Sequence, residues 1–72
     1  MVNVNKLKGK LVEREMTVEA LAAQLGINRA TLYRKLSNGA EKLLVREANA
    51  IVSILGLTPE EAMSIFFNQF VA

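Results

Sequence analysis

Hydrophobic residues recur at intervals of three and four near the start of the chain, the spacing that places them on one face of an α-helix. Val4, Leu7 and Leu11 form such a face within residues 3–15, and lysine and glutamate residues occupy the remaining faces. The pattern predicts an amphipathic first helix, with Gly9 as its weakest helix-forming position.

Two short helices follow, separated by a tight turn. Thr17 can cap the first by accepting a free backbone N–H, and Gly26 ends it where a left-handed backbone is favourable. Asn28 can cap the second, whose Leu32 and Leu36 face the interior. Because the turn is so short, we expect the two helices to cross steeply. The apolar face of the first of them consists of Ala20, Leu21, Ala22 and Leu25.

A turn and a loop lead to a fourth helix. Ser37, Asn38 and Gly39 are typical of a turn, and residues 40–43 form a connecting loop. The fourth helix is predicted from about Val45 to Leu55, and Gly56 ends it. Its inward face consists of Ala48, Ile51, Val52 and Leu55.

The clearest helix start in the chain is Thr58-Pro59-Glu60-Glu61. It combines an N-cap, a proline in the first turn and a glutamate three residues after the cap. The fifth helix is predicted from Pro59 to about Gln69, with Ala62, Ile65 and Phe66 turned inward. No segment alternates as a strand does, and no repeat or linker interrupts the chain. We therefore expect an all-α fold, a single compact domain of five helices over residues 1–72.

Composition argues against catalysis. The chain has no cysteine and no histidine, which excludes disulfides, thiolate zinc sites, imidazole metal ligands and serine-histidine or cysteine-histidine nucleophiles. The adjacent Glu60 and Glu61 are explained by helix capping. We expect no enzyme, no cofactor, no metal and no small-molecule substrate.

The chain also lacks the features of a secreted or membrane protein. It has no apolar signal segment, and its longest uncharged stretch, residues 62–72, is far shorter than the roughly 20 residues that a membrane-spanning helix needs. We expect a cytoplasmic protein of a bacterial host, associated with the nucleoid.

Positive charge is concentrated before residue 47. The net charge is +2, yet all nine lysine and arginine residues lie at or before Arg46, with four acidic residues among them, a local net charge of +5. After Arg46 only three glutamates are charged. The basic part can therefore face a polyanion while the acidic part faces away. The alternative is a solvated surface that happens to be asymmetric.

Residues 17–37 have the spacing of a helix-turn-helix. Ala22 is small where a second helix would cross, Gly26 follows four residues later in the turn, and Ile27 and Leu32 can hold the crossing angle from the core. Such a pair projects its second helix into the major groove of DNA. The alternative is an ordinary pair of packed helices without a ligand.

With Leu32 and Leu36 turned inward, polar side chains cover the outer face of the third helix. Arginine can present two parallel donors to guanine, alanine can meet a thymine methyl group, and tyrosine can bond a base edge or a phosphate. The candidate base contacts are Arg29, Ala30, Tyr33 and Arg34. The candidate DNA-backbone contacts are Thr17, Asn28, Lys35, Ser37, Asn38 and Lys42. For each of them, the alternative is a solvated surface residue.

The segment TVEALAAQLGINRATLYRKLSNG, residues 17–39, resembles the helix-turn-helix of the phage Cro and λ-repressor-like (XRE) family. LYRKLSNG followed by REANAIVSILGLTPEEAMSIFF is similar to small prophage-encoded regulators of that family. The resemblance covers roughly residues 5–70 and implies a compact five-helix λ-repressor-like domain that acts on operator DNA. The chain departs from the family at Lys35, where an apolar residue is common, and at Leu44, where a threonine cap is common.

The last helix carries more apolar residues than one inward face requires. A dimer formed through it would suit palindromic operators, whose half-sites lie about 34 Å apart. The candidate dimer surface consists of Met63, Phe67, Phe70 and Val71. Alternatively, Phe67 and Phe70 fold back over the first helix of their own chain.

These observations favour a sequence-specific regulator of transcription, a phage or prophage repressor that binds double-stranded DNA as a homodimer at an inverted repeat. One alternative is a protein-interaction or oligomerisation module that uses its apolar C-terminal helix. Another is a phage DNA-packaging or excision accessory protein, which would use the same DNA-contacting residues.

Overall fold

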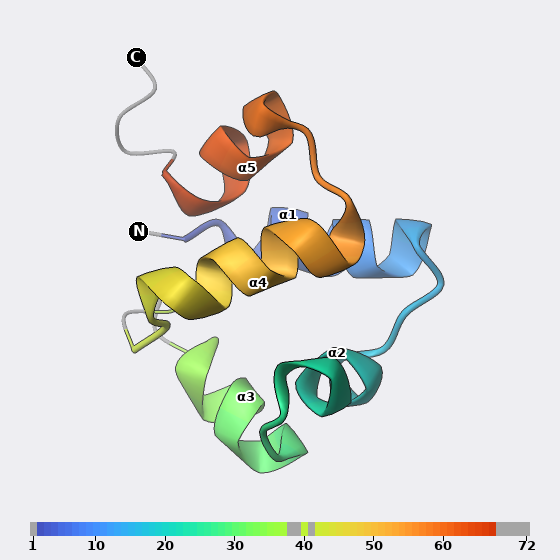
Figure 1. The fold of residues 1–72 in the computed structure, drawn as a ribbon, viewed down its shortest axis with the longest axis vertical. Helices are drawn as coiled ribbons and strands as arrows, with labels where there is room; N and C mark the ends of the chain where they lie inside the picture. The colour runs from blue at the N-terminus through green and yellow to red at the C-terminus, as the bar shows by residue number, and fades with distance from the viewer. Residues whose placement is uncertain (1, 38–39, 41, 68–72) are drawn as a thin grey trace.

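The computed structural model describes residues 2–37, 40 and 42–67, and in these residues the chain forms five helices and no strand (Figure 1). The all-α prediction is therefore confirmed. The helices are α1 (Val4–Glu13), α2 (Val18–Leu25), α3 (Arg29–Lys35), α4 (Val45–Leu55) and α5 (Pro59–Phe66).

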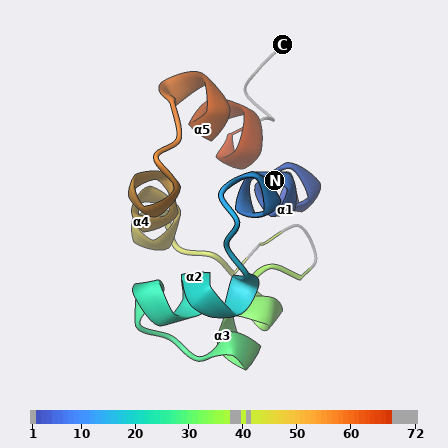
Figure 2. The ribbon, with the colours of Figure 1, turned by 90° about the vertical axis from the view of Figure 1, so that its right-hand side faces the viewer.

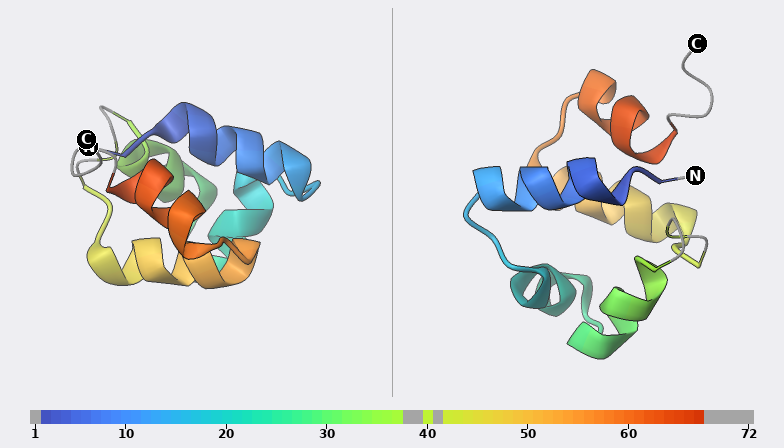
Figure 3. Two further views of the ribbon diagram at one scale, coloured as in Figure 1. Left: turned by 90° about the horizontal axis from the view of Figure 1, so that it is seen from above. Right: turned by 180° about the vertical axis from the view of Figure 1, so that it is seen from behind.

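The helices are arranged in three layers along the longest axis of the molecule (Figures 1 and 2). α5 covers one end, α1 and α4 lie side by side in the middle, and α2 and α3 form the other end (Figures 2 and 3). The two helices at the α3 end are consecutive in the chain, whereas α1 and α5 meet from opposite ends of it.

The predicted caps position the helix starts. Thr17 Oγ1 accepts the N–H of Ala20 at 3.0 Å, and Asn28 Oδ1 accepts the N–H of Thr31 at 3.1 Å. Gly26 ends α2 with a φ of +73°, the left-handed conformation in which glycine avoids the clash of a Cβ atom. Because both caps and the glycine are local features, the pattern of residues was sufficient to predict them.

Two helices end earlier than predicted. α1 ends at Glu13 rather than near residue 15, because Glu15 adopts a left-handed φ of +55° and turns the chain toward α2. α5 ends at Phe66, and the following Phe67 has a non-helical φ of −128°. The remainder of the predicted fifth helix, residues 68–69, lies outside the described residues.

The core is built from the apolar face of every helix. Leu7, Leu21, Leu32, Ile51 and Ile65 are its largest fully buried side chains. Ala20, predicted on the inner face of α2, is exposed instead, and Ala62 is only half-buried. Between the helices, Ala40 and Leu57 add buried side chains that helical periodicity cannot identify.

α1 is joined to α5 by polar contacts. The Asn3 N–H donates to the Ile65 carbonyl at 2.7 Å, and the Lys10 ammonium forms an ion pair with Glu61. The Lys10 ammonium, followed by the Thr58 N–H, lowers the pKa of Glu61 from 4.5 to about 2.

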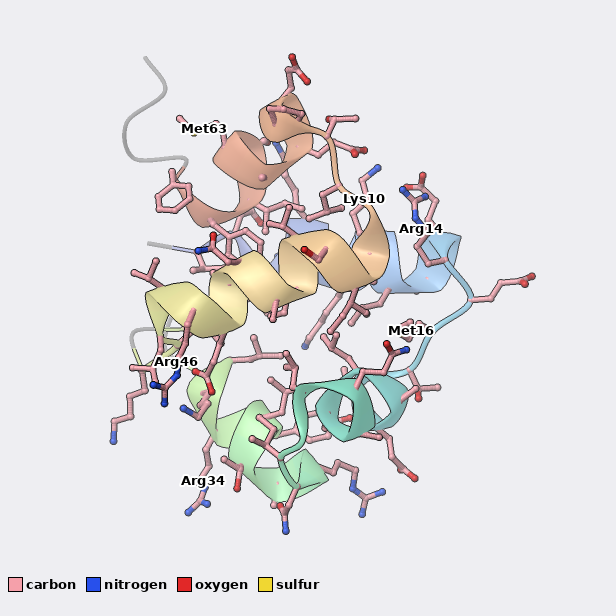
Figure 4. All side chains as sticks on the ribbon, viewed as in Figure 1. Lys10, Arg14, Met16, Arg34, Arg46 and Met63 are labelled. Carbon is pink, nitrogen blue, oxygen red and sulfur yellow. The ribbon has the colours of Figure 1, made fainter. Side chains whose placement is uncertain are left out.

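The basic residues of the first segment do not all lie on the same face of the folded protein. Lys10 and Arg14 of the basic segment lie toward α5, whereas Arg34 lies at the opposite end of the molecule and Arg46 in the first turn of α4 (Figure 4). The Arg14 Nε–H donates to the Leu55 carbonyl at 2.9 Å, at the end of α4. The expectation of one basic part facing a polyanion therefore applies only to the cations near α3.

Across the described residues, no helix is long and apolar enough to cross a membrane. Within the same residues, no three histidine, cysteine, aspartate or glutamate side chains gather closely enough to hold a metal ion.

Candidate nucleic-acid interface

The turn between α2 and α3 has the geometry that the sequence predicts. Ala22 is 1% exposed, and its carbonyl accepts the N–H of Ile27 at 3.0 Å, which closes the turn around Gly26. Leu21 and Leu32 are fully buried on the two sides of the crossing. A larger residue at position 22 would separate the helices, so the crossing angle depends on this alanine.

The outer face of α3 is exposed as predicted. Arg29, Ala30, Tyr33 and Arg34 are all exposed, whereas Leu32 and Leu36 are buried on the other side. Figure 4 shows Arg34 extending away from the rest of the molecule at the α3 end. This end of the protein therefore offers two guanidinium groups and a phenol to an external partner.

An ion pair joins the first turns of α2 and α3. The Arg29 Nη1 donates to Glu19 Oε2 at 2.9 Å, and both side chains are about two-thirds exposed, at 64% and 67%. Glu19 was not among the candidate site residues. Its contact with Arg29 depends on how the two helices cross, which residue spacing does not specify.

A hollow of about 240 Å³ lies beside the C-terminal half of α3. It is lined by Thr31, Arg34, Lys35 and Lys42. The three cations come from α3 and from the segment that follows it, and one of them, Lys35, is paired with Glu47. Thr31 is the member that the sequence did not single out, because its position between the two faces of α3 gave no signal.

Lys35, a candidate backbone contact, already has an intramolecular partner. Its ammonium lies 3.0 Å from Glu47 Oε1, and the two side chains are only 21% and 13% exposed. Glu47 also accepts the N–H of Leu44 at 2.9 Å. Burial raises the pKa of Glu47, but the Leu44 N–H and the Lys35 ammonium outweigh it, so the pKa lies below its usual 4.5.

This arrangement accounts for both departures from the family pattern. Lys35 occupies a commonly apolar position by extending its stem over the protein and ending on Glu47. Leu44 has no side-chain oxygen to cap α4, yet its own N–H is satisfied by Glu47, and α4 begins directly after it at Val45. The fourth helix therefore starts where predicted without a threonine cap.

The other candidate backbone contacts differ in what their side chains already do. Thr17 and Asn28 are exposed and each caps the helix that follows. The Ser37 hydroxyl donates to the Tyr33 carbonyl at 2.9 Å, so its proton is engaged within the chain. Lys42 is exposed at the rim of the hollow. Asn38 lies outside the described residues.

Of the candidate dimer residues, Met63 is 42% exposed and extends from α5 (Figure 4). Phe67 is half-buried and packs against the core of its own chain. Phe70 and Val71 lie outside the described residues. Among the described members of this set, Met63 is therefore the one with an exposed side chain.

Comparison with known families agrees with this geometry. The model of a family described as the Cro/C1-type HTH DNA-binding domain matches residues 6–67, which include α2 to α5 and most of α1. No curated protein and no solved structure matches the chain.

Proposed function

The chain belongs to the family of Cro/C1-type helix-turn-helix DNA-binding domains, and from this premise we propose that it is a phage or prophage repressor whose α3 enters the major groove of operator DNA. The observation that carries the proposal is the division of α3 into a buried apolar face and an exposed face with two arginines. A repressor of this kind acts by occupying a promoter and blocking transcription.

We assign recognition of the DNA bases to the exposed face of α3. Arg29 and Arg34 are each suited to donate two parallel hydrogen bonds to guanine O6 and N7. Ala30 is suited to contact a thymine methyl group, and Tyr33 to bond a base edge or a phosphate. Their common exposure on one short helix supports this assignment.

Contacts to the DNA backbone would flank this face. Thr17 and Asn28 stand at the starts of α2 and α3, where free N–H groups and the helix dipole favour a phosphate. Lys42 supplies a cation at the hollow for a DNA phosphate. Lys35 lies at the same hollow, where its ammonium is paired with Glu47. Ser37 and Asn38 complete the proposed set.

We also propose that the protein binds DNA as a homodimer at an inverted repeat. A two-fold dimer reads two half-sites about 34 Å apart with two copies of α3. The exposed Met63 on α5 supports a contact through that helix. Met63→Ser should therefore weaken dimer formation while leaving the fold intact, as measured by sedimentation and circular dichroism.

The first experiment is selection of bound duplexes from a random DNA pool at two salt concentrations. We expect an inverted repeat to be recovered, and its half-site spacing gives the dimer geometry. Weak binding that yields no motif and disappears as the salt concentration rises would contradict the proposal. It would mean that only electrostatic attraction to the DNA phosphates holds the protein. The protein-interaction hypothesis would then be the better one.

Alanine variants measured on the recovered operator test the assigned roles. Arg29→Ala and Arg34→Ala should each lose about 1–3 kcal/mol of binding free energy at one base pair, whereas Lys42→Ala should weaken binding to all sequences alike. Equal losses on operator and random duplexes for all three variants would show that α3 does not read bases.

A further inference from the structure

The ion pair between Glu19 and Arg29 places a carboxylate directly beside a proposed base-reading group. Glu19 lies in the first turn of α2 and Arg29 at the start of α3, and their 2.9 Å contact spans the turn between the two helices. A glutamate in a first helical turn interacts favourably with the helix dipole. That role explains a negative charge at position 19 but not its contact with Arg29.

The contact restricts the guanidinium group. Arginine carries five N–H donors in one rigid plane, and recognition of guanine needs two of them aligned with O6 and N7. The Glu19 carboxylate engages Nη1 and so limits rotation of the group, which leaves the other donors in a defined orientation. Arg34, by contrast, makes within the described part of the chain a 3.5 Å contact with the neutral Thr31 hydroxyl.

The same carboxylate opposes indiscriminate binding. Phosphates that approach the start of α2 would meet the negative charge of Glu19, and part of the Arg29 charge is already neutralised by the ion pair. Binding therefore gains least from Arg29 where the DNA offers it only a phosphate, and most where a correctly placed guanine accepts its oriented donors.

We propose that Glu19 is a positioning residue for DNA recognition, which holds Arg29 in the orientation that reads one base pair and lowers affinity for duplexes lacking it. This inference rests on the proposed function, since it requires α3 to contact base edges. It adds a residue on α2 to the determinants of sequence specificity.

The chain contains a matched control. Glu60 is the second residue of α5, as Glu19 is of α2, and it is likewise exposed. α5 lies at the opposite end of the molecule from α3 (Figure 1). Glu60→Gln therefore makes the same change in net charge and in helix-dipole interaction as Glu19→Gln, without affecting Arg29.

The test compares wild-type protein with Glu19→Gln, Glu19→Asp and Glu60→Gln on the selected operator, its single-base variants and a random duplex. Glu19→Gln should bind the random duplex up to about fivefold more tightly, and lose discrimination by a similar factor at the base pair that Arg29→Ala identifies. Glu19→Asp keeps the charge but shortens the side chain, so it should lose the discrimination alone. Glu60→Gln should change neither quantity.

Thermal melting of each variant confirms that it is folded. The ion pair itself can be followed in the DNA-free protein, where the Arg29 Nε–H resonance should shift with Glu19→Gln and stay unchanged with Glu60→Gln. An equal gain in affinity on all duplexes, with discrimination retained, would overturn the inference and leave the proposed function standing. A wild-type protein that distinguishes no duplexes would instead refute both.

Discussion

Among the residues that the structure describes, two other than glycine adopt a left-handed backbone, Glu15 with a φ of +55° and Ala40 with a φ of +61°. Such a conformation costs about 1–2 kcal/mol for a residue with a Cβ atom. At Glu15 it lets the Met16 N–H return to the Leu11 carbonyl at 2.8 Å and close the end of α1. The Ala40 side chain is buried, whereas that of Glu15 is exposed, so only Glu15 can be replaced without loss of packing.

We therefore expect Glu15→Gly to raise the free energy of unfolding by about 0.5–1 kcal/mol, because relief of strain exceeds the greater entropy of glycine in the unfolded chain. Urea denaturation measures the change. Lys8→Gly, at an exposed interior position of α1, is the control and should lower stability by about 1 kcal/mol. A loss at position 15 as large as that at position 8 would mean that no strain is stored there.

For single residues, the sequence predicts the role correctly where a side chain acts on its immediate neighbours in the chain. The capping roles of Thr17, Asn28 and Thr58 follow from residue type and position, and all three accept the expected N–H. The strain at Glu15 did not follow, because glutamate is common in helices and nothing in its type indicates a positive φ.

Between elements, the junction of α3 with α4 depends on Lys35 and Glu47. Glu47 accepts from the Lys35 ammonium at 3.0 Å and from the Leu44 N–H at 2.9 Å, which joins the end of α3 to the start of α4. Because both side chains are mostly buried, loss of either partner leaves a poorly solvated charge.

A double-mutant cycle measures this junction. Lys35→Met keeps the aliphatic stem and Glu47→Gln keeps an acceptor for the Leu44 N–H, and each should lower the free energy of unfolding by about 1–2 kcal/mol. The double variant should lose less than the sum, with a coupling energy of about 0.5–2 kcal/mol. Additive losses would show that the ion pair contributes nothing beyond its separate members.

The five helices of the described residues and most of their inward faces could be predicted because helical periodicity is a property of each segment alone; Ala20 is the exception, since it is exposed. The contacts of Glu19 with Arg29 and of Lys35 with Glu47 could not, because each depends on the angle between two helices. The exposure of the candidate base contacts on α3 was therefore predicted, whereas the carboxylates that pair with Arg29 and Lys35 were not.

Over the whole molecule, folding brings part of the basic segment against the acidic one. The basic α1 packs against the acidic start of α5, where the Lys10 ammonium pairs with Glu61. The sequence shows nine cations before residue 47, but the fold decides which of them remain available at the α3 end. The net basicity of the first segment was thus an incomplete guide to the charge at the α3 end.

The Lys10–Glu61 contact makes stability depend on pH at the acid end. The pKa of Glu61 falls from 4.5 to about 2 on folding, so its contribution is complete above about pH 5 and is lost as pH falls toward 2. Acid denaturation of wild-type protein and Glu61→Gln should show a stability difference that shrinks within this window. Lys10→Met should remove most of the same pH dependence, and a difference that is constant from pH 6 to pH 2 would contradict the assignment.

The contacts of α1 also determine when the domain can assemble during its synthesis. The polar partners of α1 in other helices lie far along the chain, since Arg14 reaches Leu55 and Asn3 reaches Ile65. α2 and α3, by contrast, are neighbours joined by a short turn. On a ribosome α2 and α3 can therefore pack together early, while α1, although synthesised before them, stays without these partners until residue 65 has left the exit tunnel. The domain therefore completes its fold only after its last helix has been synthesised.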